Sequence, residues 1–297
     1  MRRMAVLGIV VSLLAACGAN SPSSSGSKLQ VVAAENFWGS LAAQLGGERV
    51  QVTSIVASPD VDPHDYEPTP SDGRGIASAR YVIFNGLGYD PWAGDAIDAN
   101  PADNRSVLDV GKLLGLKAGD NPHRWYFPDD VHRVIAQITA DYKQLDPDHA
   151  AYFDAQRTTF ETTGLSRYDS LLAEIKQRFS GTPVGASESI FVGVARATAL
   201  DLITPSEFMT AISEGTDPTA DSKKTVDDQI TGKQIAVFVY NSQNATPDVQ
   251  TLLDAARSSG VAIATITEAP PEGVSFQDWQ ANELQGLIDA LAGATHK

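Results

Sequence analysis

The sequence predicts an α/β protein: two βα lobes with parallel-type sheets, joined by one long connecting helix. Three observations support this prediction. Short apolar runs alternate with amphipathic runs in both halves, which is typical of parallel strands covered by helices. Between the halves lies a stretch with no strand pattern and with apolar residues at helical spacing. A chain of 297 residues is also long enough to build two moderate domains.

In the first half, strand and helix patterns follow one another closely. Apolar runs at 29–34, 50–57 and 81–84 predict strands. Residues 37–45 have the spacing of a helix, and so do residues 131–145, which are preceded by a proline and two aspartates. Acidic residues at a helix start are favoured by the helix dipole. This half, residues 29–145, is predicted to be the N-terminal lobe.

The predicted connecting helix occupies residues 146–180. Asp146 and Pro147 resemble an N-cap followed by proline at the first helical position. A helix of about 33 residues would be roughly 50 Å long. Gly164 predicts a bend within it. The apolar face consists of Leu165, Tyr168, Leu171, Leu172, Ile175 and Phe179.

In the second half, residues 181–297, the alternation resumes and predicts the C-terminal lobe. The expected strands are 182–186, 234–240 and 261–266, and the expected helices are 190–200, 247–260 and 274–291. Ligands of parallel α/β sheets bind at the loops that follow the strands. A site between the two lobes would therefore draw on such loops from both.

The N-terminus has the features of an exported, lipid-anchored protein. Two arginines precede an apolar run that is too short to span a bilayer, so residues 1–16 are interpreted as a cleaved signal peptide. The run ends in Leu-Ala-Ala-Cys, which resembles a lipobox, and Cys17 is the only cysteine of the chain. Lipidation of Cys17 would account for this unpaired cysteine. Residues 17–28 are rich in Ser and Gly and are predicted to be a flexible tether.

Charge limits the choice of partner. The formal net charge is −15 and the pI about 4.6, which argues against nucleic acid, because phosphate binding needs clustered Lys and Arg. An acidic surface is compatible with attracting cations, although many soluble proteins also have one.

Two histidines lie in loops that are stiffened by proline. His64 lies in "SPDVDPHDYEPTP" and His123 in "DNPHRWYFPDD", and both loops follow strand regions. Proline lowers the entropy that such a loop loses on ordering. Asp65, Tyr66 and Glu67 are candidates for orienting His64 through hydrogen bonds. Each loop histidine taken alone could equally be an ordinary surface residue.

The second half offers carboxylates at equivalent places. Glu188 follows one expected strand in "GASES", and Glu268 follows another in "TEAPPEG". Two imidazoles and two carboxylates suit a four-residue site for a divalent transition metal. Glu272 is the nearest alternative to Glu268. No zinc-protease HExxH motif and no P-loop occur, and "GASES" lacks the final glycine of a nucleophile elbow.

From about residue 29 to 292 the chain resembles the metal-binding lipoproteins of bacterial zinc and manganese ABC importers. The stretches that carry this resemblance include "DVDPHDYEPTPSD", "NPHRWYFPDDVHRVIAQI", "GASESIFVGVARATAL" and "VAIATITEAPPEGVSFQDW". The resemblance implies two lobes with little hinge motion and one metal between them. It also implies His64, His123, Glu188 and Glu268 as ligands, although Glu268 stands where the family usually has Asp.

The resemblance implies a function as well: capture of Mn²⁺ or Zn²⁺ outside the cell membrane and delivery to an ABC transporter permease, by a monomer without enzymatic activity. Carboxylates favour manganese more than a three-histidine set would, but zinc has the higher intrinsic affinity for such sites, so the metal stays open. Two alternatives remain, a secreted metallohydrolase using the same residues and a surface adhesin on the same scaffold. Hydrolysis would need an open coordination position for water.

Overall fold

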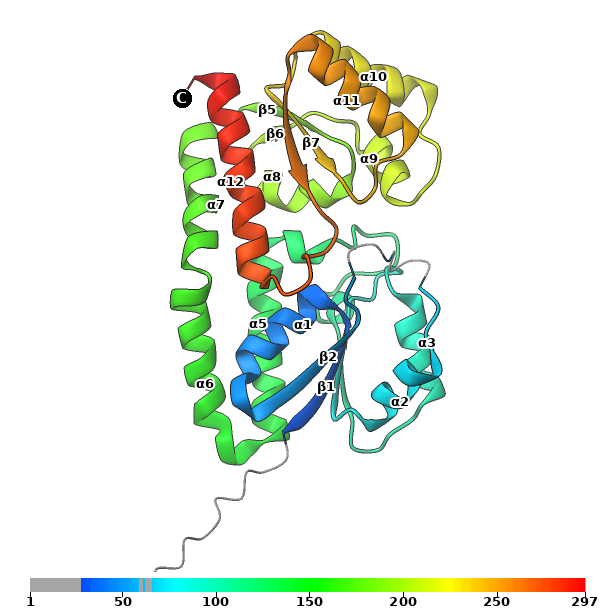
Figure 1. Ribbon diagram of the computed structural model, residues 1–297, viewed down its shortest axis with the longest axis vertical. Coiled ribbons are helices and arrows are strands. Elements are labelled where there is room, and N and C mark those ends of the chain that lie inside the picture. The colour runs from blue at the N-terminus through cyan, green and yellow to red at the C-terminus, as the bar shows by residue number, and fades with distance from the viewer. Residues whose placement is uncertain (1–27, 59–60, 62–65, 297) are drawn as a thin grey trace, which may run out of the picture.

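The computed structural model describes residues 28–58, 61 and 66–296, which form two lobes bridged along one side by long helices (Figure 1). Each lobe contains a four-stranded sheet in which every pairing is parallel. The predicted fold class is therefore confirmed. Among the described residues, no helix combines the length and apolar content needed to cross a bilayer.

The sheet of the N-terminal lobe has the strand order β2-β1-β3-β4. Its strands are β1 (Leu29–Glu35), β2 (Val50–Val56), β3 (Tyr81–Phe84) and β4 (Ser106–Asp109). Its α-helices are α1 (Asn36–Gly46), α2 (Pro70–Ser78), α3 (Pro91–Ala99), α4 (Val110–Leu114) and α5 (Pro128–Leu145). Helices α1 and α5 lie on one side of the sheet, and α2 and α3 lie on the other (Figure 1). Apolar side chains on both faces explain why its strands appear as continuous apolar runs in the sequence.

The sheet of the C-terminal lobe has the strand order β6-β5-β7-β8. Its strands are β5 (Pro183–Ala186), β6 (Asp201–Leu202), β7 (Val237–Asn241) and β8 (Ala262–Ile266). Its α-helices are α8 (Val192–Thr198), α9 (Ser206–Ser213), α10 (Ala220–Thr231), α11 (Pro247–Ser259) and α12 (Phe276–Thr295). The central pair, β5 and β7, ends beside the N-terminal lobe, so the loops after these strands face the other half of the molecule (Figure 1).

The connecting segment is helical but not uniform. It consists of the 3-10 turn η3 (Pro147–His149), α6 (Ala150–Thr159), the π-turn η4 (Phe160–Gly164) and α7 (Ser166–Phe179). The amide of Leu165 donates to the carbonyl of Phe160 at 2.8 Å, which is the wider bond of a π-turn. The Phe160 ring lies over Gly164, where a β-carbon would come within 2.7 Å of it. The one long helix expected from the sequence is therefore interrupted by short turns, and the π-turn lies at the predicted bend.

The two lobes share one apolar core. A continuous cluster of buried side chains includes Trp38 and Trp125 of the first lobe and Phe276 and Trp279 of α12. The amide of Phe276 also donates to Ser40 Oγ in α1 at 2.9 Å. Opening the lobes would expose this apolar surface to water, so the packing resists large hinge motion.

Candidate metal centre

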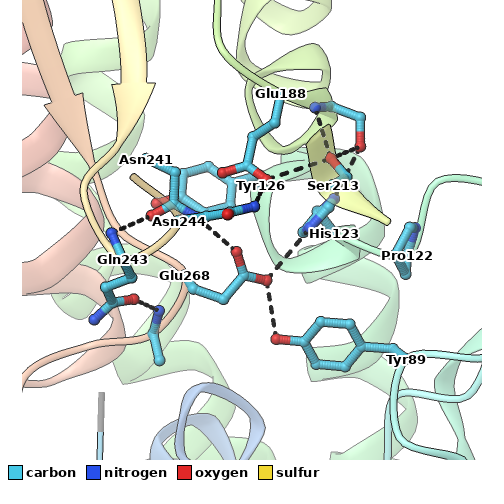
Figure 2. Close-up of polar contacts among 12 residues, drawn as sticks. Tyr89, Pro122, His123, Tyr126, Glu188, Ser213, Asn241, Gln243, Asn244 and Glu268 are labelled. Carbon is cyan, nitrogen blue, oxygen red and sulfur yellow. Dashed lines mark hydrogen bonds and ion pairs between the residues drawn. The ribbon is translucent and has the colours of Figure 1, made fainter. Parts of the chain in front are cut away.

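Three of the four predicted ligands converge between the lobes. One potential ligand atom from each of His123, Glu188 and Glu268 lies within 4.8 Å of the other two (Figure 2). His123 comes from the N-terminal lobe, and both glutamates come from the C-terminal lobe. The remaining predicted ligand, His64, and the predicted anchor, Cys17, lie outside the described residues.

His123 is oriented by a neighbour two residues away in sequence. It immediately precedes the 3-10 turn η2 (Arg124–Tyr126), and only 2% of its surface is exposed. Its Nδ1 lies 2.9 Å from Asn121 Oδ1, which also accepts the His123 backbone amide at 3.0 Å. An amide oxygen can only accept, so this contact places the proton on Nδ1 and leaves Nε2 directed at the glutamates.

Glu188 presents one oxygen with no hydrogen-bond partner. It follows β5 closely, and 2% of its surface is exposed. Its Oε2 accepts from Asn244 Nδ2 at 3.1 Å and from Ser213 Oγ at 3.4 Å. Its Oε1 is buried and has no hydrogen-bond partner among the described residues. A buried, unpaired carboxylate oxygen is costly unless a cation or proton binds it.

Glu268 lies just beyond β8 and is contacted from both lobes. Its Oε1 accepts from the Tyr89 hydroxyl at 2.9 Å and lies 3.3 Å from His123 Nε2. Its Oε2 accepts from Asn241 Nδ2 at 2.9 Å. Its side chain is 18% exposed, which makes Glu268 the most accessible of the three.

The loop that carries Glu268 is braced on both sides of that residue. Before it, the backbone amide and the hydroxyl of Thr267 both donate to Glu283 Oε1 in α12, at 2.8 and 2.7 Å. After it, the Ala269 amide donates to Gln243 Oε1 at 3.0 Å. The carbonyl of the next residue, a proline, accepts from Asn36 Nδ2 of α1 at 3.0 Å. The atypical sequence of this loop therefore still fixes the Glu268 backbone.

The pKa shifts of these residues indicate that the two carboxylates lack a balancing positive charge. Burial, followed by repulsion from Glu268, raises the pKa of Glu188 to about 7. Burial acts to lower the pKa of His123, but attraction to the Glu268 carboxylate and the hydrogen bond to it outweigh burial and raise that pKa. In the absence of metal, protons therefore balance the buried carboxylates. The donor set fits a divalent cation, which would supply the same positive charge.

Several supporting residues were not predicted from the sequence. Asn241 and Asn244 lie at and just after the end of β7, where binding residues of parallel sheets gather, so their position was an available signal. Tyr89 lies in the loop between β3 and α3, so the same positional signal was available for it. Of the residues proposed to orient His64, Tyr66 donates its hydroxyl to Asp72 Oδ2 at 2.8 Å. The alternative ligand in the Glu268 loop, the glutamate at position 272, is exposed and is not among the three described residues that converge.

The two parallel sheets, with binding residues from both lobes meeting at their strand ends, define the chain as a two-lobed solute-binding protein. Residues 31–290 match the family model described as zinc-uptake complex component A, periplasmic. The chain belongs to this family.

Individual relatives agree with this assignment. The chain is 30% identical over 165 residues to the manganese-binding lipoprotein MntA of Halalkalibacterium halodurans, an alignment that covers 52% of this chain and 53% of the relative. It is 23% identical to the manganese ABC transporter substrate-binding lipoprotein PsaA of Streptococcus mitis, with 97% of each covered.

Solved structures show the same fold. The Mn-bound structure of a periplasmic metal-binding protein from Candidatus Liberibacter asiaticus superposes with a TM-score of 0.73 at 17% identity, covering 88% of this chain and 98% of that one. A crystal structure of ZnuA gives a TM-score of 0.68 at 21% identity, with 90% and 98% covered.

Proposed function

We propose that this protein is an extracytoplasmic solute-binding lipoprotein that captures one Mn²⁺ or Zn²⁺ ion between its lobes and delivers it to the permease of an ABC importer. The observation that carries the proposal is the convergence of His123, Glu188 and Glu268, together with the unpartnered Oε1 of Glu188. His64 completes the proposed ligand set. Relatives named as metal-binding lipoproteins of ABC transporters support the transport role.

The proposed organisation follows from the same role. Residues 1–16 are removed, Cys17 carries the lipid, and residues 17–28 tether the protein to the outer face of the cell membrane. Residues 29–145 and 181–297 are the two metal-binding lobes, and residues 146–180 connect them. The protein acts as a monomer, because one chain supplies all four ligands.

The proposal includes no enzymatic activity. Two imidazoles and two carboxylates would fill the coordination positions that a hydrolase keeps open for water. The donor set itself accepts either metal. Carboxylate oxygens suit Mn²⁺, whereas Zn²⁺ binds almost any such set more tightly. Which ion is carried therefore depends on supply as well as on affinity.

Calorimetric titration of the full chain in detergent with Mn²⁺ and with Zn²⁺ tests the proposal. We expect one ion per chain and a rise in the thermal midpoint, because a ligand that binds the native state stabilises it. His64→Ala should weaken binding strongly and abolish that rise. A protein that binds neither ion, or a His64→Ala variant with the parent's affinity, would contradict the proposed site.

A further inference from the structure

Tyr89 brings a hydroxyl group from one lobe to a carboxylate of the other. It lies between β3 and α3, and its side chain is fully buried. Its ring centroid is 4.9 Å from that of Trp125 and 6.2 Å from that of His123. The ring is therefore fixed by the aromatic core of the N-terminal lobe, and only its hydroxyl reaches across to Glu268 (Figure 2).

The carboxylate of Glu268 is held at both oxygens, by a different lobe at each. Tyr89 donates to Oε1 at 2.9 Å and Asn241 donates to Oε2 at 2.9 Å. The oxygen that Tyr89 holds is also the one that lies 3.3 Å from His123 Nε2. By contrast, the hydrogen bonds to the other glutamate of the site, at position 188, come from side chains of its own lobe.

The phenol is suited to hold the carboxylate in place. Its ring is fully buried, and its hydroxyl donates to Glu268 Oε1 at 2.9 Å. A glutamate side chain has three rotatable bonds, and ordering it costs conformational entropy. A donor fixed on a rigid ring restrains these bonds before the cargo ion arrives.

We propose that Tyr89 is a positioning residue for the cargo metal, which fixes the carboxylate of Glu268 so that Oε1 faces His123 Nε2. This inference rests on the proposed function. It assigns Tyr89 no direct bond to the metal. It makes the placement of a ligand from the C-terminal lobe depend on a side chain of the N-terminal lobe, so that site geometry and lobe packing are linked.

Tyr89→Phe removes the hydroxyl and keeps the ring. Because the metal must then order the Glu268 side chain itself, which costs up to about 2 kcal/mol, we expect up to about 30-fold weaker binding of Mn²⁺ and Zn²⁺ by the full chain. The matched control is Tyr142→Phe. Tyr142 is also fully buried, and its hydroxyl donates to the carbonyl of Ala42 at 2.9 Å, within the core of the N-terminal lobe. This control should keep the parent's metal affinity.

A double-mutant cycle separates positioning through Glu268 from a general structural effect. In the Glu268→Ala background there is no carboxylate to hold, so Tyr89→Phe should cause no further loss of affinity. An equal loss in both backgrounds would overturn the inference, as would a Tyr89→Phe variant that binds like the parent. Circular dichroism checks that each variant is folded. If Tyr89→Phe does not fold, Tyr89→Leu is a second variant that lacks the hydroxyl. A parent protein that binds no metal contradicts the proposed function instead.

Discussion

Replacing Glu188 with Gln should change metal-free stability and metal binding in opposite directions. The substitution keeps the size of a side chain that is buried between the lobes but removes its ability to ionise. Burial raises the pKa of Glu188 from its usual 4.5 to about 7. At about 1.4 kcal/mol per tenfold change in proton affinity, ionised Glu188 costs the metal-free native state about 3 kcal/mol.

The sign follows from where the proton is bound. Below pH 4.5 Glu188 is protonated in both the folded and the unfolded state, so its charge costs nothing. Between pH 4.5 and about 7 only the folded state keeps the proton, so stability falls as pH rises. The glutamine of the Glu188→Gln variant cannot ionise. The metal-free variant and parent should therefore have similar free energies of unfolding near pH 4. Near pH 8 the variant should be more stable by up to about 3 kcal/mol.

Urea unfolding with a chelator present, at both pH values, measures this difference. Added metal should then reverse the order, because at about 1,000 times its dissociation constant it stabilises the parent by about 4.1 kcal/mol and the variant much less. Glu207→Gln, at an exposed position of α9, is the matched control and should change neither quantity. If the stability of the variant relative to the parent does not rise between pH 4 and pH 8, the electrostatic reasoning is refuted. One that binds metal like the parent would refute the assignment of Glu188 as a ligand.

Three further predictions concern the anchor, the fourth ligand and protons. Cys17→Ser should move the protein from the membrane fraction to the medium or leave the signal peptide uncleaved; a processed, membrane-bound variant would contradict lipidation. Glu268→Gln should weaken metal binding while Glu272→Gln, in the same loop but exposed, should not; the reverse result would move the fourth ligand to Glu272. Metal binding near pH 7 should release protons, because the metal displaces protons that the raised pKa values of His123 and Glu188 retain. Calorimetry in buffers of different ionisation enthalpy measures that release, and a binding enthalpy independent of buffer would contradict it.

Six of the eight strands of the described residues were predicted, because parallel sheets bury both faces, whereas the short edge strands β4 and β6 were missed. β3 (Tyr81–Phe84) was predicted with the bounds that the structure shows, and β8 (Ala262–Ile266) to within one residue. Helix α11 was predictable from the proline at its start and Gly260 at its end, which adopts a left-handed conformation with φ of 72°.

One helix that sequence patterns missed, α10, has a buried face that is not plainly apolar. Helix α10 buries Ser222 and Gln229 along with Val226 and Ile230, so its apolar periodicity is incomplete. Gln229 is accommodated there because its Nε2 donates to the carbonyl of Ile203 at 2.7 Å. That partner belongs to a distant segment, so no local pattern could have shown which group the buried amide nitrogen would reach.

Prediction of the candidate site was limited in the same way. His123, Glu188 and Glu268 were found because each lies in a loop that follows a strand region, a position that can be read from the sequence. Asn121 is two residues from His123 and could have been inferred from its distance in sequence. The contact between Tyr89 and Glu268 joins residues 179 positions apart and exists only because the lobes pack together. Contacts of this kind depend on tertiary structure rather than on local pattern.

The same contacts explain how a site between two lobes can load a metal with little movement of the lobes. Without metal, His123 and Glu268 already meet across the boundary at 3.3 Å, with a proton favoured by the raised pKa of His123. With metal, the proposed ligand set places a divalent cation among two carboxylates and neutral imidazoles. Both states are close to neutral, which a buried site requires because unbalanced charge is costly there. Protons and metal are thus alternative counter-charges for the same two glutamates. The three described side chains of the proposed site already lie together, so we expect loading to exchange protons for metal rather than to close an open cleft.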